Sequence, residues 1–211
     1  MNKFLRSSFE HYSEQDFDTL LNIKTDPYLE TFTNHHSNRY EPTIYHDLLL
    51  LFNMIKEDLN EDALLVDFGS GLMRVPIFTN YVFKIKTIGI ELNKQLYLKS
   101  LENIKNYSLL HHQENDVTAQ NINALQYQFS GKETHLFFFN PFSVFVFQKV
   151  MDNLMTSSIE KCDIILYYAK PEYEVYLQDI IHFNLKYHIP LQQINNDPSE
   201  KINIYEYTKS I

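Results

Sequence analysis

The sequence places an aspartate, two glycines and a glutamate at spacings that suggest a ligand site. Asp67, Gly69 and Gly71 lie in the run Val66–Arg74, and Glu91 follows about twenty residues later, where an acid can accept hydrogen bonds from a ribose. Glycine lets the backbone turn tightly and approach a ligand where a side chain would clash. A helix that begins after such a loop also offers free N–H groups. The pattern predicts a site for a ribose-containing ligand, and the alternative is a tight strand-to-helix turn that binds nothing.

The same loop restricts which ligand it could hold. A dinucleotide loop of the dehydrogenase type would need a third glycine where Arg74 stands, so a dinucleotide is disfavoured. The sequence contains no Gly-x-Ser-x-Gly elbow and no P-loop. The sequence therefore contains no motif that indicates a serine hydrolase or a P-loop nucleoside triphosphatase.

A second group of interest is the run Phe137–Phe142, in which Asn140 and a proline follow three phenylalanines. We expect Asn140 at the end of a buried strand, because ligands of such sheets bind beyond the carboxyl ends of the strands. The alternative is a turn without chemistry, since Asn-Pro commonly opens a loop. The histidine pairs at 35–36 and 111–112 are adjacent in sequence, and no carboxylate stands at ligand spacing from them. We therefore predict no metal site.

The elements that must position these residues alternate between short apolar runs and stretches with helical spacing. Such alternation indicates a mostly parallel sheet covered by helices on both faces. The last two strands are joined by a short polar link, so we expect them to be antiparallel. Expected strands are Ala63–Asp67, Lys86–Glu91, Ser108–Gln113, His135–Phe139, Asp163–Tyr168, Leu185–Ile194 and Ile202–Thr208. Expected helices are Thr43–Leu59, Asn93–Asn106, Ala119–Phe129, Ser143–Ser157 and Glu172–Phe183.

Composition excludes several classes of protein. The 211 residues include only four glycines, against roughly 15 in an average chain, which excludes collagen-like and glycine-rich linker proteins. A single cysteine, Cys162, excludes an internal disulfide framework and fits a reducing cytoplasm. We see no signal peptide, and the longest apolar stretch is too short for a bilayer span. The formal net charge is −9 with no run of lysine or arginine, so we expect no membrane partner and consider bulk nucleic acid an unlikely partner.

The run Val66–Arg74, followed by Ile88–Leu92, resembles the class I S-adenosylmethionine-dependent methyltransferases. The resemblance covers roughly residues 40 to 168. It implies that Asp67, Gly69 and Gly71, with Arg74, form the loop around the methionine part of the cofactor. It implies that Glu91 accepts hydrogen bonds from the ribose hydroxyls. It also implies that Asp116, after the third strand, meets the adenine amino group, although a solvated loop aspartate is the alternative.

The resemblance extends to two further segments. The residues around Arg39–Thr43 look like the leading segment of a poorly characterised bacterial branch, in which Tyr40 and Thr43 would lie near the methionine end of the cofactor. The run at Asn140 resembles the catalytic motif Asn/Asp-Pro-Pro-aromatic of amino-directed methyltransferases, with one proline missing. By that match the Asn140 side chain accepts a hydrogen bond from the target amine, Phe142 packs on the substrate, and Asn140 also lies near the cofactor.

Two departures leave an alternative open. Leu72 and Met73 replace the smaller residues commoner in these loops, which would narrow the room for a phosphate and suit a phosphate-free cofactor. The catalytic motif, in addition, has a single proline. Both would also fit a methyltransferase-like binding or regulatory module that has lost its activity.

The prediction is an α/β, Rossmann-like, seven-stranded and mostly parallel sheet with an antiparallel C-terminal hairpin and helices on both faces. Residues 1–60 would form an N-terminal helical cap and residues 61–211 the methyltransferase domain. We expect a cytoplasmic bacterial enzyme with S-adenosylmethionine as its cofactor. It would transfer a methyl group in line to a nitrogen or oxygen, mainly by alignment and desolvation. The acidic balance favours a protein or a small molecule as methyl acceptor, and nothing in the sequence reports the oligomeric state.

Overall fold

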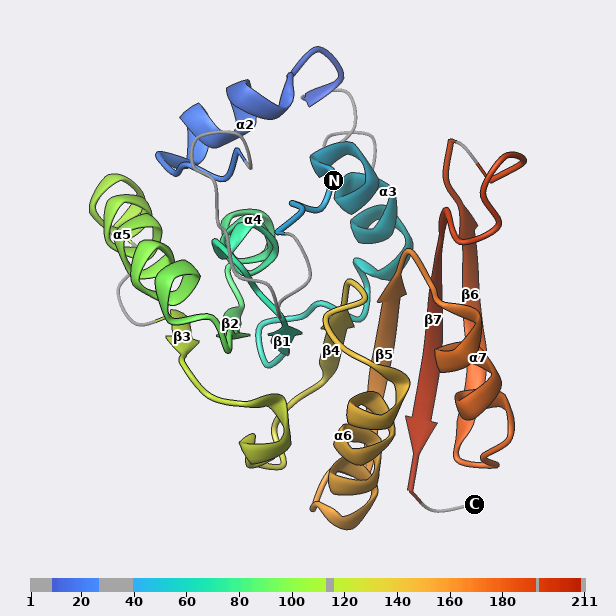
Figure 1. Cartoon of the computed structure of the whole chain (residues 1–211). Helices are drawn as coiled ribbons and strands as arrows, with labels where there is room; N and C mark the ends of the chain where they lie inside the picture. Colours follow the sequence, from blue (N-terminus) through green and yellow to red (C-terminus); the bar gives the residue numbers. More distant parts are fainter. Residues whose placement is uncertain (1–8, 27–39, 113–115, 193, 210–211) are drawn as a thin grey trace.

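A seven-stranded sheet forms the centre of the molecule (Figure 1). The structure is a computed structural model that describes residues 9–26, 40–112, 116–192 and 194–209. The strands follow the order β3-β2-β1-β4-β5-β7-β6, and β7 runs in the direction opposite to the other six. This confirms the predicted sheet with its antiparallel C-terminal hairpin. The strands are β1 Leu64–Phe68, β2 Lys86–Ile90, β3 Val117–Gln120, β4 His135–Phe138, β5 Lys161–Tyr167, β6 Phe183–Pro190 and β7 Lys201–Thr208.

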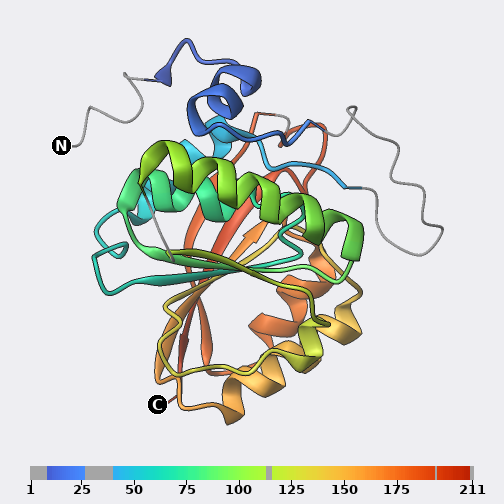
Figure 2. The same ribbon diagram turned by 90° about the vertical axis from the view of Figure 1, so that its left-hand side faces the viewer.

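Helices cover both faces of the sheet (Figure 2). They are α2 Glu14–Leu21, α3 Tyr45–Ile55, α4 Arg74–Phe83, α5 Lys94–His111, α6 Val144–Thr156 and α7 Pro171–Gln178, with a short 3₁₀ turn at Ala124–Gln126. Strand β4 contributes to the core on both faces of the sheet, because alternate side chains of a strand point to opposite faces. Phe137 packs in the cluster under α2, α3 and α4, whereas Leu136 and Phe138 pack in the cluster under α6 and α7.

The strand order reverses direction between β1 and β4, and this reversal fixes where a ligand can bind. From β1 the chain crosses outward to β2 and β3, then returns to the other side of β1 as β4. Loops that leave β1 and β4 therefore diverge, and a crevice opens between the carboxyl ends of the two strands. The predicted glycine loop and Asn140 follow these two strands.

Two expected elements are absent from the part of the chain that the structure describes, and elsewhere some bounds shift by a few residues, as where α7 ends at Gln178 and β6 spans Phe183–Pro190. The expected strand Ser108–Gln113 is wrong: α5 continues to His111, and the third strand is β3, Val117–Gln120. Leu109 and Leu110 suggested a strand, but they are exposed on the helix surface. The expected helix Ala119–Phe129 is wrong as well, because it contains the end of β3, a loop and the single 3₁₀ turn.

The two N-terminal helices belong to the core on one face of the sheet, and α2 packs on α3 and α4, with the Phe17 ring 4.6 Å from that of Tyr45 and 5.4 Å from that of Phe78. Phe17 of α2 and Leu48 of α3 belong to the same buried cluster as Phe137 of β4 and Ile204 of β7. The described residues of α2 and α3 thus share a core with the sheet, and the predicted domain boundary at residue 60 remains a prediction. Within the described part of the chain, no helix combines the length and the apolar character that a membrane crossing requires.

Candidate active site

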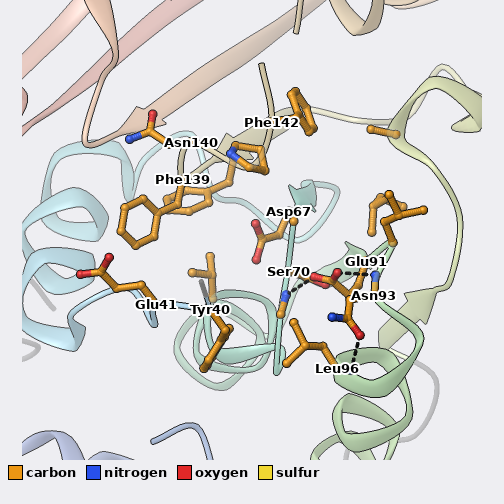
Figure 3. A pocket seen from close by; sticks show the side chains of 18 of the residues that line it. Tyr40, Glu41, Asp67, Ser70, Glu91, Asn93, Leu96, Phe139, Asn140 and Phe142 are labelled. Carbon is orange, nitrogen blue, oxygen red and sulfur yellow. Dashed lines mark hydrogen bonds between the residues drawn. The ribbon is translucent and has the colours of Figure 1, made fainter. Parts of the chain in front are cut away.

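A cleft of about 1220 Å³ lies at the carboxyl ends of β1, β2, β4 and β5 (Figure 3). Its size suits a ligand larger than most drug-sized molecules. In Figure 3 the Asp67 carboxylate lies between Glu91 and the phenyl ring of Phe139. Nine of the ten predicted site residues line the cleft: Tyr40, Thr43, Asp67, Gly69, Gly71, Arg74, Glu91, Asn140 and Phe142.

The glycine loop has the backbone shape that only glycine adopts without strain. Gly69 and Gly71 have φ angles of 85° and 51°, in the left-handed region that disfavours a side chain. A Cβ on Gly69 would lie 2.5 Å from Pro141, and a Cβ on Gly71 would lie 2.4 Å from the Tyr40 ring. The two glycines therefore let β1, the loop after β4 and the segment at Tyr40 approach one another around the cleft.

Leu72 and Met73, the two bulky residues of the loop, do not narrow the cleft. Both are buried and neither lines it. Gly89 of β2 makes the space for Met73, because a Cβ there would lie 2.0 Å from the Met73 sulfur. Met73 packs in the buried cluster that residues of α4 share with the sheet, so the expectation that the two bulky residues narrow the ligand site is wrong.

The Glu91 carboxylate holds the glycine loop by a hydrogen bond and can accept further hydrogen bonds from a ligand. One carboxylate oxygen accepts the Gly71 N–H at 2.9 Å and the other accepts the Asn93 N–H at 2.7 Å. Burial raises the pKa of Glu91, and these two backbone donors oppose the rise. Each oxygen of a carboxylate has two lone pairs, so each can accept one more hydrogen bond. The geometry suits two adjacent hydroxyl groups.

Asp67 is a buried carboxylate that lines the cleft. It is 4% exposed, and no described residue donates a hydrogen bond to it. Burial raises its pKa well above the usual range, and the negative charge of Glu91 adds to the rise. The neighbouring Ser70 hydroxyl is also buried without a partner. Polar groups left unpaired in a cleft are costly and would be satisfied by a ligand that carries a cationic or hydroxyl group.

Arg74 lines the cleft, but its guanidinium binds the N-terminal segment. It donates to the Thr25 hydroxyl at 2.7 Å, to the Thr43 carbonyl at 3.0 Å and to Glu14. It also lies 4.3 Å above the Tyr45 ring. These contacts fasten the chain between α2 and α3 to the start of α4, so Arg74 holds Thr43 at the cleft. Direct contact of Arg74 with a cofactor remains a prediction.

Asp116 lies at the wrong edge of the sheet for its predicted role. It precedes β3, and its carbonyl accepts the N–H of Thr87 near the beginning of β2. It is absent from the cleft, so the prediction that it meets an adenine amino group is wrong. The error follows from the misplaced third strand. The residues that line the cleft after β3 are Ile122, Asn123 and Ala124.

An apolar slot accompanies these residues. Leu92, which follows Glu91 and is 67% exposed, lines the cleft with Ile122 and Val146. Side chains of this kind suit a flat ring, and Glu91 lies directly beside them in sequence. Sequence reasoning missed both residues: Leu92 directly follows the predicted strand Lys86–Glu91, whereas Ile122 lay inside the wrongly predicted helix Ala119–Phe129.

Asn140 and Phe142 lie where the motif places them, after β4. Asn140 has a φ of 43°, and its side-chain N–H donates to the Tyr168 carbonyl at 2.8 Å. The Phe142 carbonyl accepts the Tyr173 hydroxyl at 2.6 Å, and its ring packs edge-on to Phe138 with centroids 6.1 Å apart. Phe139, Tyr168 and Lys170 also line this part of the cleft. Within the described ranges, no group of three or more His, Cys, Asp or Glu side chains could hold a metal ion.

Comparison with known proteins identifies the fold. No family model matches the sequence. No curated protein matches it either. Solved structures do match: an RNA methyltransferase from Salinibacter ruber in complex with S-adenosyl-L-homocysteine has a TM-score of 0.58 at 16% identity, over 80% of this chain and 93% of that one. A protein from Pyrococcus horikoshii, proposed to be an RNA methyltransferase, has a TM-score of 0.64 at 13% identity, over 93% of this chain and 98% of that one. The N-terminal domain of human METTL16 in complex with S-adenosylhomocysteine has a TM-score of 0.58 at 10% identity, over 92% and 79% of the two chains.

The chain therefore has the fold of the class I S-adenosylmethionine-dependent methyltransferases, as the sequence resemblance implied. At these identities the similarity establishes the fold, and the activity has to be argued from the site. One expectation is overturned. RNA methyltransferases recur among the similar structures, so the preference against bulk nucleic acid as a partner was wrong. That preference rested on net charge, which averages over the whole surface and does not describe the cleft.

Proposed function

We propose that this protein is an S-adenosylmethionine-dependent methyltransferase that transfers a methyl group to a nitrogen of a nucleic-acid base, with RNA as the favoured acceptor. The observation that carries the proposal is the meeting of two motifs at one cleft. The loop of Gly69 and Gly71 with Glu91 comes from β1 and β2, and Asn140 comes from β4. The RNA acceptor is suggested by the proteins that share the fold.

The cofactor fits the unpaired groups of the cleft. Glu91 would accept the two ribose hydroxyls with its remaining lone pairs, and Leu92 with Ile122 would enclose the adenine ring. Asp67 would accept the ammonium group of the methionine part, with the Gly69–Gly71 loop and Tyr40 around it. Bound there, S-adenosylmethionine would supply a methyl group already activated by its attachment to a sulfonium.

The protein residues would then align the acceptor. The Asn140 amide oxygen would accept a hydrogen bond from the target amine and direct its lone pair toward the methyl group. Phe142 would pack on the flat base, since aromatic rings stack on any base face. No strong base is needed to deprotonate the acceptor, because the methyl group is already activated by the sulfonium. The protein would contribute mainly by aligning the acceptor and excluding water. Methyl transfer to an oxygen acceptor would use the same alignment.

A binding module without activity is the second candidate. Two sequence features motivated it, and burial of Leu72 and Met73 outside the cleft removes one of them. The other stands, because Phe142 directly follows Pro141 where the related motif has a second proline. This candidate predicts cofactor binding without transfer, or no binding.

A transfer assay separates the two candidates. Protein is incubated with tritiated S-adenosylmethionine and total cellular RNA, and the RNA is digested to nucleosides to identify the methylated base. We expect label in a base amine and a fall of about 100-fold or more in rate for Asn140→Ala, because an oriented acceptor contributes on that scale. S-adenosylhomocysteine affinity of this variant should stay within about twofold, since Asn140 would act on the acceptor. Cofactor binding with no label in RNA would favour the binding module.

A further inference from the structure

The loop between β6 and β7 reaches the same edge of the sheet as the cleft. Because β7 runs antiparallel, its first residues lie beside the last residues of β5, and Ile202 pairs with Tyr167. We define the hairpin loop as residues 194–200. It is held in shape by its own bonds: the Asp197 carboxylate accepts the Ser199 N–H at 2.9 Å, and the Asp197 carbonyl accepts the Glu200 N–H at 2.9 Å.

Tyr168 is clamped between this hairpin loop and the cleft. Its N–H donates to the Lys201 carbonyl at 3.0 Å. Its hydroxyl donates to the Asp197 carboxylate at 3.0 Å and lies 3.4 Å from a carboxylate oxygen of Glu200. The φ of Tyr168 is 57°, a left-handed conformation that a bulky residue keeps only when its surroundings impose it. The bonds to Lys201 and Asp197 are those surroundings.

The clamped residue in turn holds Asn140. The Asn140 side-chain nitrogen donates to the Tyr168 carbonyl at 2.8 Å, and Asn140 also has a positive φ of 43°. An asparagine amide is planar, with donors at one end and an acceptor at the other. If the amide were reversed, its oxygen would face the carbonyl oxygen of Tyr168, and two acceptors repel. The Tyr168 carbonyl therefore determines which end of the amide is the donor and fixes Oδ1 at the other end.

We propose that Tyr168 is a positioning residue for Asn140 and that the hairpin loop, through Asp197, sets the orientation of the amide that receives the target amine. This inference rests on the proposed function for its consequence in catalysis. The chain of contacts runs from the Asp197 carboxylate to the Tyr168 hydroxyl, and from the Tyr168 carbonyl to the Asn140 amide. An acceptor that displaces the hairpin loop would change methyl transfer without touching the cofactor.

Two variants test the link, with a matched control. Tyr168→Phe removes the hydroxyl, and Asp197→Ala removes its partner on the exposed loop. Tyr176→Phe is the control, because its hydroxyl also bonds an aspartate, Asp152 at 3.3 Å, but it does not line the cleft. The side-chain amide NMR signals of Asn140, assigned by their loss in Asn140→Asp, should shift in both test variants and stay unchanged in the control.

The transfer assay supplies the second readout. With total cellular RNA and saturating cofactor, we expect Tyr168→Phe to lower the rate about tenfold, because small misplacements of an aligning group are costly. S-adenosylhomocysteine affinity should not change. In an Asn140→Ala background Tyr168→Phe should have no further effect, since residues that act through one another are not additive.

Unchanged Asn140 signals in both variants would overturn the inference, as would a loss of rate that persists in full without Asn140. The NMR measurement needs neither cofactor nor acceptor. Failure of the wild type to bind S-adenosylhomocysteine would therefore count against the proposed function alone, while the Asn140 signals would still decide whether Tyr168 positions the amide.

Discussion

The two edges of the sheet bury aspartates in opposite ways. At the amino edge, Asp163 of β5 accepts the Lys186 ammonium at 2.8 Å, and the same ammonium lies 2.9 Å from Asp58. At the carboxyl edge, Asp67 of β1 has no donor among the described residues. Burial raises the pKa of both acids, but Lys186 opposes the rise only at Asp163.

The difference separates a structural acid from a site for a ligand. A buried charge is stable when the protein supplies its partner, and the amino edge supplies one from β6. The nearby His135 lies 3.9 Å from Asp163, and burial lowers its pKa to about 4, so it is neutral at neutral pH and adds no second cation. Among the described residues, the carboxyl edge supplies no hydrogen-bond donor to Asp67 and no partner to the Ser70 hydroxyl. We infer that the missing partners are groups of the cofactor.

The largest expected effect is at the carboxyl edge. Glu91→Ala removes the acceptors proposed for two ribose hydroxyls and leaves the Gly71 N–H unpaired. Hydrogen bonds to a charged group contribute about 1.5–3 kcal/mol each, so we expect S-adenosylhomocysteine affinity to fall about 100-fold in equilibrium dialysis. Glu102→Ala, an exposed acid of α5 outside the cleft, is the control. A loss of less than about threefold in Glu91→Ala would remove Glu91 from the binding site.

The next effect is at the amino edge and concerns stability alone. Lys186→Met leaves Asp163 buried without its cation, which costs several kcal/mol in a fully buried pair. Because Lys186 is 22% exposed, we expect a loss of about 2 kcal/mol in urea unfolding. Lys149→Met is the matched control, since its pair with Asp152 is exposed and should contribute at most about 0.5 kcal/mol. A large loss of cofactor affinity in Lys186→Met would contradict the separation of the two edges.

The smallest effect has a characteristic dependence on pH. Folding raises the pKa of Asp67 above its unfolded value, so the native state binds more protons and its stability falls as pH rises above about 4. Asp67→Asn abolishes this loss and should stabilise the free protein by about 1 kcal/mol at pH 8, since an unpaired buried polar group costs about 1–3 kcal/mol.

The measurement is thermal unfolding of both proteins between pH 4 and pH 8. The gain from Asp67→Asn should shrink toward pH 4, where Asp67 is protonated in the folded state and about half protonated in the unfolded state. The same variant should bind S-adenosylhomocysteine more weakly, because stability gained at a binding site commonly costs function. A destabilised Asp67→Asn would mean that Asp67 is a structural acid like Asp163.

The sequence predicted those parts of the site that depend on residue spacings within a short stretch of the chain. Two glycines after a buried strand and an acid at the end of the next strand can be recognised because both spacings are fixed by one strand-loop-helix-strand unit. Asn140 could be placed because a prolonged apolar run ends at it. These residues meet at the cleft because the carboxyl ends of parallel strands share one edge.

The features that the sequence did not predict depend on contacts between residues distant in the chain. The run Ser108–Gln113 resembled a strand because Leu109 and Leu110 are apolar, yet they extend an 18-residue helix and face solvent. Because the third strand was predicted too early in the sequence, Asp116 was assigned to its carboxyl end. For the same reason Ile122, which follows the actual strand β3, was not predicted to line the cleft. The direction in which Met73 points could not be predicted either, because it depends on the space that Gly89 leaves in a different strand.

The central claim is that the cleft at the carboxyl edge binds S-adenosylmethionine, and calorimetric titration of the wild-type chain with S-adenosylhomocysteine tests it most directly. The account predicts one site per chain with a dissociation constant of about 1–100 µM, corresponding to roughly 5–8 kcal/mol of binding free energy. The absence of binding up to about 1 mM ligand, in protein that unfolds cooperatively, would contradict it.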